Sequence, residues 1–117
     1  MSFREVACVI GAQGQVLGWF EGSYGQVPDS QALWLLLWEQ RENVVGVAHT
    51  HPGRGVPTPS HEDTSTWEAV EAALGHSLLW WISSADTLRW WCSEHPPLLP
   101  PTPWVGELRE RSQYASL

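Results

Sequence analysis

The sequence contains no lysine, only two cysteines and no long apolar run, and each absence excludes a class of protein. All six basic residues are arginine and the formal net charge is −7, so we expect no nucleic-acid-binding surface, which would need clustered cations. No apolar stretch approaches the roughly 20 residues that span a membrane. The first residues lack the apolar region of a secretory signal. We therefore expect a cytoplasmic protein with no membrane contact.

The two cysteines, Cys8 and Cys92, are far apart in the sequence and form no CxxC pair. Both lie in apolar, strand-like surroundings, which predicts buried free thiols rather than metal ligands.

The length and composition predict one small domain followed by a tail. The chain has 117 residues, of which 43% are hydrophobic and 16% charged, values typical of an ordered domain with one core. Five of the nine prolines lie between residues 96 and 103, where they exclude a regular helix. We therefore predict a domain over residues 1–95. The Pro-rich tail, residues 96–117, is expected to pack on the domain or to be partly disordered.

Apolar, partly β-branched segments predict five strands, at residues 5–11, 16–20, 44–48, 78–82 and 88–92. Residues 32–38 are apolar throughout, but the length and leucine content of this block favour a helix over residues 30–42, capped by Asp29 or Ser30 after a loop at 22–29. A second helix is predicted to open at residues 60–63 and to end before Gly75. This order of elements indicates a layered α/β or α+β domain.

Adjacent tryptophans occur in the last two predicted strands, as Trp80-Trp81 and Trp90-Trp91. Successive side chains of a strand point to opposite faces, so each pair places one ring on each face of the sheet. Two large aromatic rings therefore lie on a second face, and we expect that face to be covered.

Two histidines follow the third predicted strand, at His49 and His51. Because they are two residues apart on a strand, their imidazoles face the same side, as a pair of metal ligands would. After a loop of glycines and prolines, Ser60 and Asp63 form a Ser-x-x-Asp pattern that is also typical of a helix-capping box. Two histidines and one aspartate would leave the fourth position of a zinc ion open for water, as in catalytic zinc sites.

The segment His49-Thr50-His51-Pro52, seven residues, then Ser60-x-x-Asp63 resembles the signature of the JAMM (MPN-plus) metalloproteases, His-x-His-Pro-x7-Ser-x-x-Asp. The resemblance implies one zinc ion per chain, bound by His49, His51 and Asp63, with Ser60 stabilising the oxyanion of the tetrahedral intermediate. It also implies the JAMM/MPN architecture, which is similar to that of cytidine deaminases: a single mixed β-sheet flanked by helices.

The general base of this family is a glutamate near the beginning of the first core strand. Glu5, which precedes the apolar run 6–10 and Gly11, matches that position, and Glu21 is the alternative. Family members usually carry a helix before this glutamate, and here only residues 1–4 precede it. We therefore expect the usual first helix to be lacking, and the face it leaves open to be covered by the tail or by a second subunit in a homodimer.

The resemblance implies a zinc-dependent peptidase or isopeptidase that cleaves an amide bond at the C-terminal tail of a ubiquitin-like or sulfur-carrier-like protein. Glutamate would act as the general base on a metal-bound water. Two alternatives stay open: a non-catalytic MPN-type scaffold, which the complete ligand set argues against, and a structural zinc site, for which no fourth protein ligand is evident.

Overall fold

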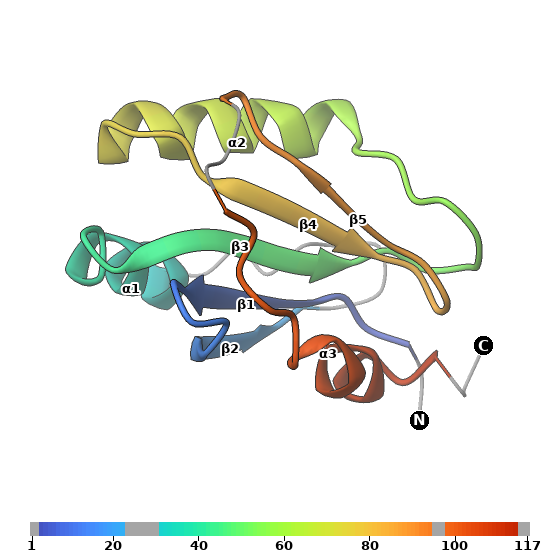
Figure 1. Ribbon diagram of the computed structural model, residues 1–117. Helices are drawn as coiled ribbons and strands as arrows, with labels where there is room; N and C mark the ends of the chain where they lie inside the picture. Colours follow the sequence, from blue (N-terminus) through green and yellow to red (C-terminus); the bar gives the residue numbers. More distant parts are fainter. Residues whose placement is uncertain (1–2, 23–30, 95–97, 115–117) are drawn as a thin grey trace.

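The computed structural model describes residues 3–22, 31–94 and 98–114, which form one β-sheet with helices on both faces (Figure 1). The predicted helix cap at Asp29 or Ser30 and most of the predicted loop at 22–29 lie outside these residues. No described helix is long and apolar enough to cross a membrane. In chain order the elements are β1 (Val6–Gly11), β2 (Val16–Glu21), α1 (Gln31–Glu39), β3 (Val44–Thr50), α2 (His61–Leu74), β4 (Leu79–Ser83), β5 (Leu88–Trp91) and α3 (Val105–Ser112).

The five strands form one sheet in the order β2-β1-β3-β4-β5. Strands β3 and β4 are parallel, and α2 makes the crossover that a parallel pair requires. The other neighbours are antiparallel, so the sheet is mixed. The predicted fold class, a single mixed sheet flanked by helices, is confirmed, and the predicted strands agree with the observed ones within one or two residues.

The two predicted helices are present, but α1 is shorter than expected. It ends at Glu39 rather than at residue 42, because the polar residues after it form turns in which the Asn43 amide donates to the Gln40 carbonyl at 2.7 Å. Helix α2 begins after Ser60 and ends at Leu74, and its C-cap Gly75 has a φ of 81° in the left-handed region that favours glycine. Both ends of α2 therefore lie where the sequence predicts them.

Helices α1 and α2 cover one face of the sheet, and α3 covers the other. On the first face, Leu37 of α1 and Val70 of α2 pack with Val9, Val47 and Trp80. On the second face, the core consists of the strand residues Val6, Cys8, Ile10, Ala48, Leu79 and Trp81 together with Trp104 and Leu108. The C-terminal segment therefore covers part of this second face, and the homodimer stays a prediction.

Helix α3 was not predicted from the sequence. Its eight residues are mostly polar, and only Leu108 and Ser112 are buried, so they carry no clear helical periodicity. The chain reaches it through residues 98–104, which run across the sheet to α3 without regular structure, as their prolines require (Figure 1). The described residues ahead of β1 are not helical.

The tryptophan pair of β4 divides between the two faces, as predicted. Trp80 stacks on Trp67 of α2 with ring centroids 5.3 Å apart, and Trp81 meets Trp104 edge-on at 5.2 Å. The expectation that the second face is covered is correct at Trp81, which is 2% exposed, but wrong at Trp90, which is 40% exposed. Trp90 lies on the edge strand β5, whereas α3 packs on β1 and β3.

Both cysteines are free thiols, as predicted. Cys8 is buried in the core against α3, and this burial raises the pKa of its thiol. The prediction of burial is wrong for Cys92, which is only half-buried because it follows the edge strand β5.

Candidate metal centre

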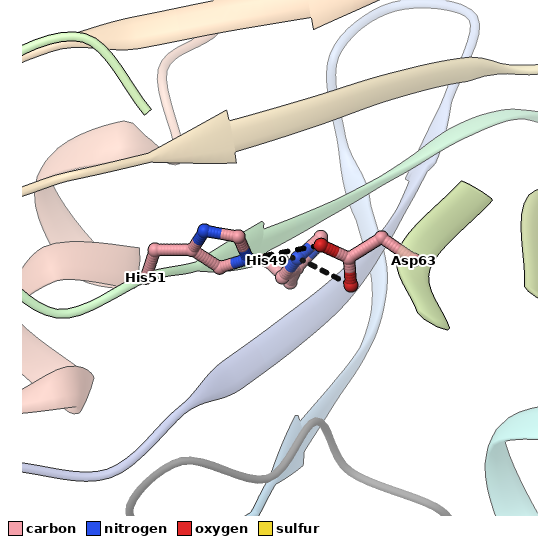
Figure 2. A group of neighbouring side chains, drawn as sticks. All are labelled: His49, His51 and Asp63. Atoms are coloured by element: carbon pink, nitrogen blue, oxygen red, sulfur yellow. Dashed lines mark hydrogen bonds and ion pairs between the residues drawn. The ribbon is translucent and has the colours of Figure 1, made fainter. Parts of the chain in front are cut away.

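The two histidines lie at the end of β3 on the face covered by α1 and α2. His49 is the penultimate residue of the strand and is 4% exposed, and His51 follows the last one. Because both share the alternation of Val47, which packs with the helices of that face, their rings project to the same side. Their Nε2 atoms are 3.1 Å apart, and their rings meet at 62° (Figure 2).

Asp63 reaches the histidines from the first turn of α2 (Figure 2). Its Oδ1 lies 3.4 Å from His49 Nε2, and its Oδ2 lies 3.1 Å from His51 Nε2. The connecting loop turns back toward the strand through Gly53 and Gly55, whose φ angles of 95° and 83° suit glycine. The side chain of Asp63 is held by the helix cap, since its Oδ2 accepts a hydrogen bond from the Ser60 amide at 2.9 Å.

The three side chains fit a zinc ion. Ligand atoms about 2.0–2.1 Å from one tetrahedral ion lie about 3.3–3.4 Å from one another. The separations of 3.1, 3.1 and 3.4 Å among His49 Nε2, His51 Nε2 and the Asp63 oxygens are close to that value. Among the described residues, these three form the group of histidine, cysteine or acidic side chains that could hold a metal ion.

The charges in the cluster support one another. Burial alone would raise the pKa of Asp63, but hydrogen bonds with His49, His51 and the Ser60 amide outweigh it and hold that pKa well below its usual range. The hydrogen bond to Asp63 in turn raises the pKa of His51. The aspartate is therefore ionised and ready to bind a cation at neutral pH.

Glu5 lies beside this cluster, one residue before β1. It is 5% exposed, and its Oε2 has no hydrogen-bond partner among the described residues. Burial raises its pKa to about 7, an effect that His51 opposes and that Asp63 and Glu62 reinforce electrostatically. A buried carboxylate oxygen without a donor is unusual, and a pKa near neutrality is suited to a group that accepts and releases a proton.

Ser60 is the N-cap of α2, so the predicted capping box is present. Its Oγ accepts a hydrogen bond from the Asp63 amide at 3.0 Å. A hydroxyl that accepts at its oxygen still carries a proton to donate, so the capping role leaves Ser60 able to act on a bound group.

The alternative base, Glu21, lies on the opposite face of the sheet. It pairs with Val6 across the β1–β2 ladder, and Val6 packs in the core under α3. Its carboxylate forms ion pairs with Arg4 at 3.3 Å and with Arg111 at 3.6 Å. The structure thus brings Glu5, and not Glu21, to the histidines and Asp63.

Thr50, between the two histidines, is a residue that the sequence analysis passed over. It is fully buried on the α3 face, where its Oγ1 accepts a hydrogen bond from the Val6 amide at 3.0 Å. The signature leaves this position unspecified, so no signal in the sequence marks it. Its contact ties the end of β3 to the start of β1, next to Glu5.

A cavity of about 330 Å³ opens beside the cluster, between α1 and α2. His49 and Asp63 line one part of it, and most of the remaining surface is apolar, with Leu33, Trp34, Leu37, Val47, Trp67 and Trp80 among the lining residues. This volume is at the lower end of the range for ligand sites, about 300–1,000 Å³. The cluster therefore borders a space large enough for part of a substrate.

Together, the sheet order, the helix-capped aspartate and the strand-end histidines define an α/β domain with a His-His-Asp group positioned to bind a metal. Residues 6–93 match the family described as prokaryotic homologs of the JAB domain. The chain therefore belongs to this family, and the resemblance inferred from the sequence is confirmed. A comparison with curated proteins gives no match. The matched segment contains the three candidate ligands but begins one residue after Glu5 and ends before α3.

Proposed function

We propose that this domain is a zinc-dependent peptidase or isopeptidase that cleaves an amide bond at the C-terminal tail of a ubiquitin-like or sulfur-carrier-like protein. One observation carries the proposal: the imidazoles of His49 and His51 and the carboxylate of Asp63 converge beside the buried Glu5 carboxylate, which has an oxygen without a partner among the described residues. A scaffold has no need of a buried acid whose Oε2 lacks a partner among the described residues, because burial of this kind lowers stability.

Zinc bound by the three side chains would lower the pKa of a coordinated water to about 7 and polarise the scissile carbonyl. Glu5 accepts the proton of the attacking water at Oε2 and delivers it to the departing amine. The Ser60 hydroxyl donates to the oxygen of the scissile carbonyl as negative charge develops there. Asp63 keeps its charge through the cycle, since its hydrogen bonds hold its pKa well below the usual range.

The tail of the substrate is proposed to lie extended beside the metal centre, a recognition mode in which main-chain hydrogen bonds supply affinity. The apolar cavity between α1 and α2 supports this arrangement, since it borders His49 and Asp63 and can accept an apolar side chain of the tail. The described residues that line this cavity include the acid Glu62 and no arginine, so an acidic side chain would be disfavoured there.

The test combines metal analysis with cleavage of a fusion in which a ubiquitin-like protein is linked through its C-terminal Gly-Gly to a reporter. We expect one zinc ion per wild-type chain, and its loss together with activity in His49→Ala. Glu5→Gln should keep zinc and lose about 10²–10⁴-fold in activity. Glu68→Gln is the matched control, because it removes an exposed carboxylate of α2 that lies outside the cavity lining, and it should keep both.

Each outcome separates the alternatives. Full activity in Glu5→Gln with zinc retained shows that another group is the base. A wild-type protein that binds zinc and cleaves no tail substrate fits a scaffold instead. A wild-type protein that binds no zinc rules out the proposed function.

A further inference from the structure

The C-terminal end of α3 lies against the strand end that carries the metal centre, on the opposite face of the sheet. The Tyr114 hydroxyl lies within hydrogen-bond distance of two carbonyl oxygens, that of His51 and, at 2.8 Å, that of Ser83. The Ser112 Oγ lies 2.8 Å from Thr50 Oγ1. Both Thr50 and Ser112 are fully buried, so the contact between these two residues is shielded from water.

His51 is the ligand that most needs such support. It lies one residue beyond the end of β3 and is therefore outside the regular strand. Its amide donates to the Ser83 carbonyl at 2.9 Å, and its carbonyl accepts the Tyr114 hydroxyl. With the Tyr114 contact, both the amide and the carbonyl of His51 have hydrogen-bond partners. The Tyr114 ring is itself fixed by packing against Phe3, with centroids 5.0 Å apart.

Glu5 is held by the same end of α3. Pairing between β1 and β3 begins with Ala7 and His49, so Glu5 lies beyond the end of that ladder. On the β2 side, the Glu5 carbonyl accepts a hydrogen bond from the Gly22 amide at 2.7 Å. On the β3 side, the residues that flank Glu5 are fixed by side chains and by α3: the Val6 amide donates to Thr50 Oγ1 at 3.0 Å, and the Arg4 amide donates to the Ser112 carbonyl at 3.1 Å. The hydrogen bond between Thr50 and Ser112 joins these two contacts.

We propose that Ser112 and Tyr114 are positioning residues of the metal centre: Tyr114 fixes the ligand His51, and Ser112, through Thr50, fixes Glu5 relative to the ligands. The C-terminal segment that contains α3 therefore packs on the second face of the sheet and also fixes the positions of His51 and Glu5, which serve the metal centre on the first face. This helix lies outside the segment that matches the JAB-domain family, so the arrangement is an addition to the matched domain. The role given to Glu5 rests on the proposed function, whereas the effect on the metal does not need peptidase activity.

Tyr114→Phe tests the ligand half of the proposal, because it removes the hydroxyl and keeps the ring that packs on Phe3. On the folded full-length chain, zinc affinity is measured by competition with a chromophoric chelator, and the Co²⁺-loaded protein is compared by its visible spectrum. We expect zinc to bind about tenfold more weakly, as is typical when a partner that orients a ligand is lost, with an altered Co²⁺ spectrum.

Val105→Ala is the matched control, since Val105 packs against the same core from the start of α3, at the far end from Tyr114. Val105→Ala should lower the melting temperature to a similar extent as Tyr114→Phe, without changing zinc affinity or the Co²⁺ spectrum. The proposal is overturned if Tyr114→Phe binds zinc as the wild type does, or if Val105→Ala weakens binding equally.

Thr50→Val and Thr50→Ser test the glutamate half. Valine removes the oxygen that joins Val6 to Ser112, whereas serine keeps it. We expect kcat to fall about tenfold in Thr50→Val with KM little changed, and to recover in Thr50→Ser. Equal losses in the two variants overturn this half. A wild type that binds zinc but cleaves nothing overturns the proposed function alone, and the zinc affinities of Tyr114→Phe and Val105→Ala then decide the proposal.

Discussion

Ser60 and Asp63 bind each other at the start of α2: the Asp63 amide donates to Ser60 Oγ at 3.0 Å, and the Ser60 amide donates to Asp63 Oδ2 at 2.9 Å. The same Oδ2 lies 3.1 Å from His51 Nε2. The side chain that completes the helix cap is therefore also the one that faces the histidines. The cap fixes the orientation of the carboxylate before any metal binds, which lowers the entropic cost of forming the site.

Replacing Ser60 separates its capping role from its proposed catalytic role. Ser60→Ala removes the cap acceptor and the hydroxyl, so we expect a loss of about 1 kcal/mol in the free energy of unfolding and of about 10²–10³-fold in kcat. Glycine is a good N-cap residue without a hydroxyl, and Ser60→Gly should cost only a few tenths of a kcal/mol while losing the same activity. Denaturant unfolding and cleavage kinetics measure the two effects. If Ser60→Gly keeps most of the activity, Ser60 acts only as the cap.

Zinc should stabilise the fold through His49. A ligand that binds only the folded state adds about 4 kcal/mol at a free concentration 1,000 times its Kd. For a domain of this size we expect the melting temperature to rise by more than about 10 °C when zinc is added to the metal-free protein. Scanning calorimetry with and without a chelator measures this shift.

The matched variants are His49→Ala and His61→Ala. His49 faces the cluster, whereas His61 is an exposed residue of the first turn of α2. The first variant should lose the shift and the second should keep it. A zinc-dependent shift that persists in His49→Ala would mean that the ion binds elsewhere.

The sequence predicts most of this fold because its strands are short apolar runs bounded by turn residues. The helix over 61–74 is equally clear, since Ser60 and Gly75 mark its two ends. Helix α3 could not be predicted, because its stability comes from Trp104 and Leu108 packing on strands that are distant in sequence. Local pattern carries no information about such contacts.

The candidate ligands could be predicted because a fixed spacing joins them, whereas the base could not be decided from spacing alone. Glu5 and Glu21 both adjoin a strand, and only the register that pairs Glu21 with Val6 shows that Glu21 faces α3. The contacts of Thr50 with Ser112 and of His51 with Tyr114 join residues 62 and 63 positions apart. No local motif reports pairs of this kind.

Leu108 should contribute strongly to stability, although α3 as a whole is polar. Its side chain is fully buried in the core between α3 and the sheet, where α3 packs on β1 and β3. Leu108→Ala leaves a cavity and should cost about 2–5 kcal/mol in the free energy of unfolding. Denaturant unfolding gives the value, and Val105→Ala, at a half-buried position of the same helix, should cost less. Equal costs at the two positions would mean that α3 is loosely packed in solution.

The stability of the metal-free protein should depend on pH through Glu5. Burial raises the folded pKa of Glu5 to about 7, above its ordinary value of 4.5. Between these two values the folded state holds a proton that the unfolded state has lost, so the contribution of Glu5 to stability falls as pH rises and then levels off. Glutamine has no proton to lose, so Glu5→Gln should gain stability relative to the wild type over that interval. The gain should be on the order of 1–3 kcal/mol.

Urea unfolding in the presence of a chelator, from about pH 5 to about pH 8, measures the difference between the two proteins. His51, whose raised pKa adds stability at low pH, and Asp63, whose lowered pKa adds stability above its ordinary range, are present in both proteins and largely cancel. Glu68→Gln, which alters an exposed carboxylate of α2 that does not act on the pKa of Glu5, should show a nearly constant difference from the wild type. A constant difference for Glu5→Gln as well would show that Glu5 titrates as an ordinary surface carboxylate, and would remove the main physical reason for assigning it as the base.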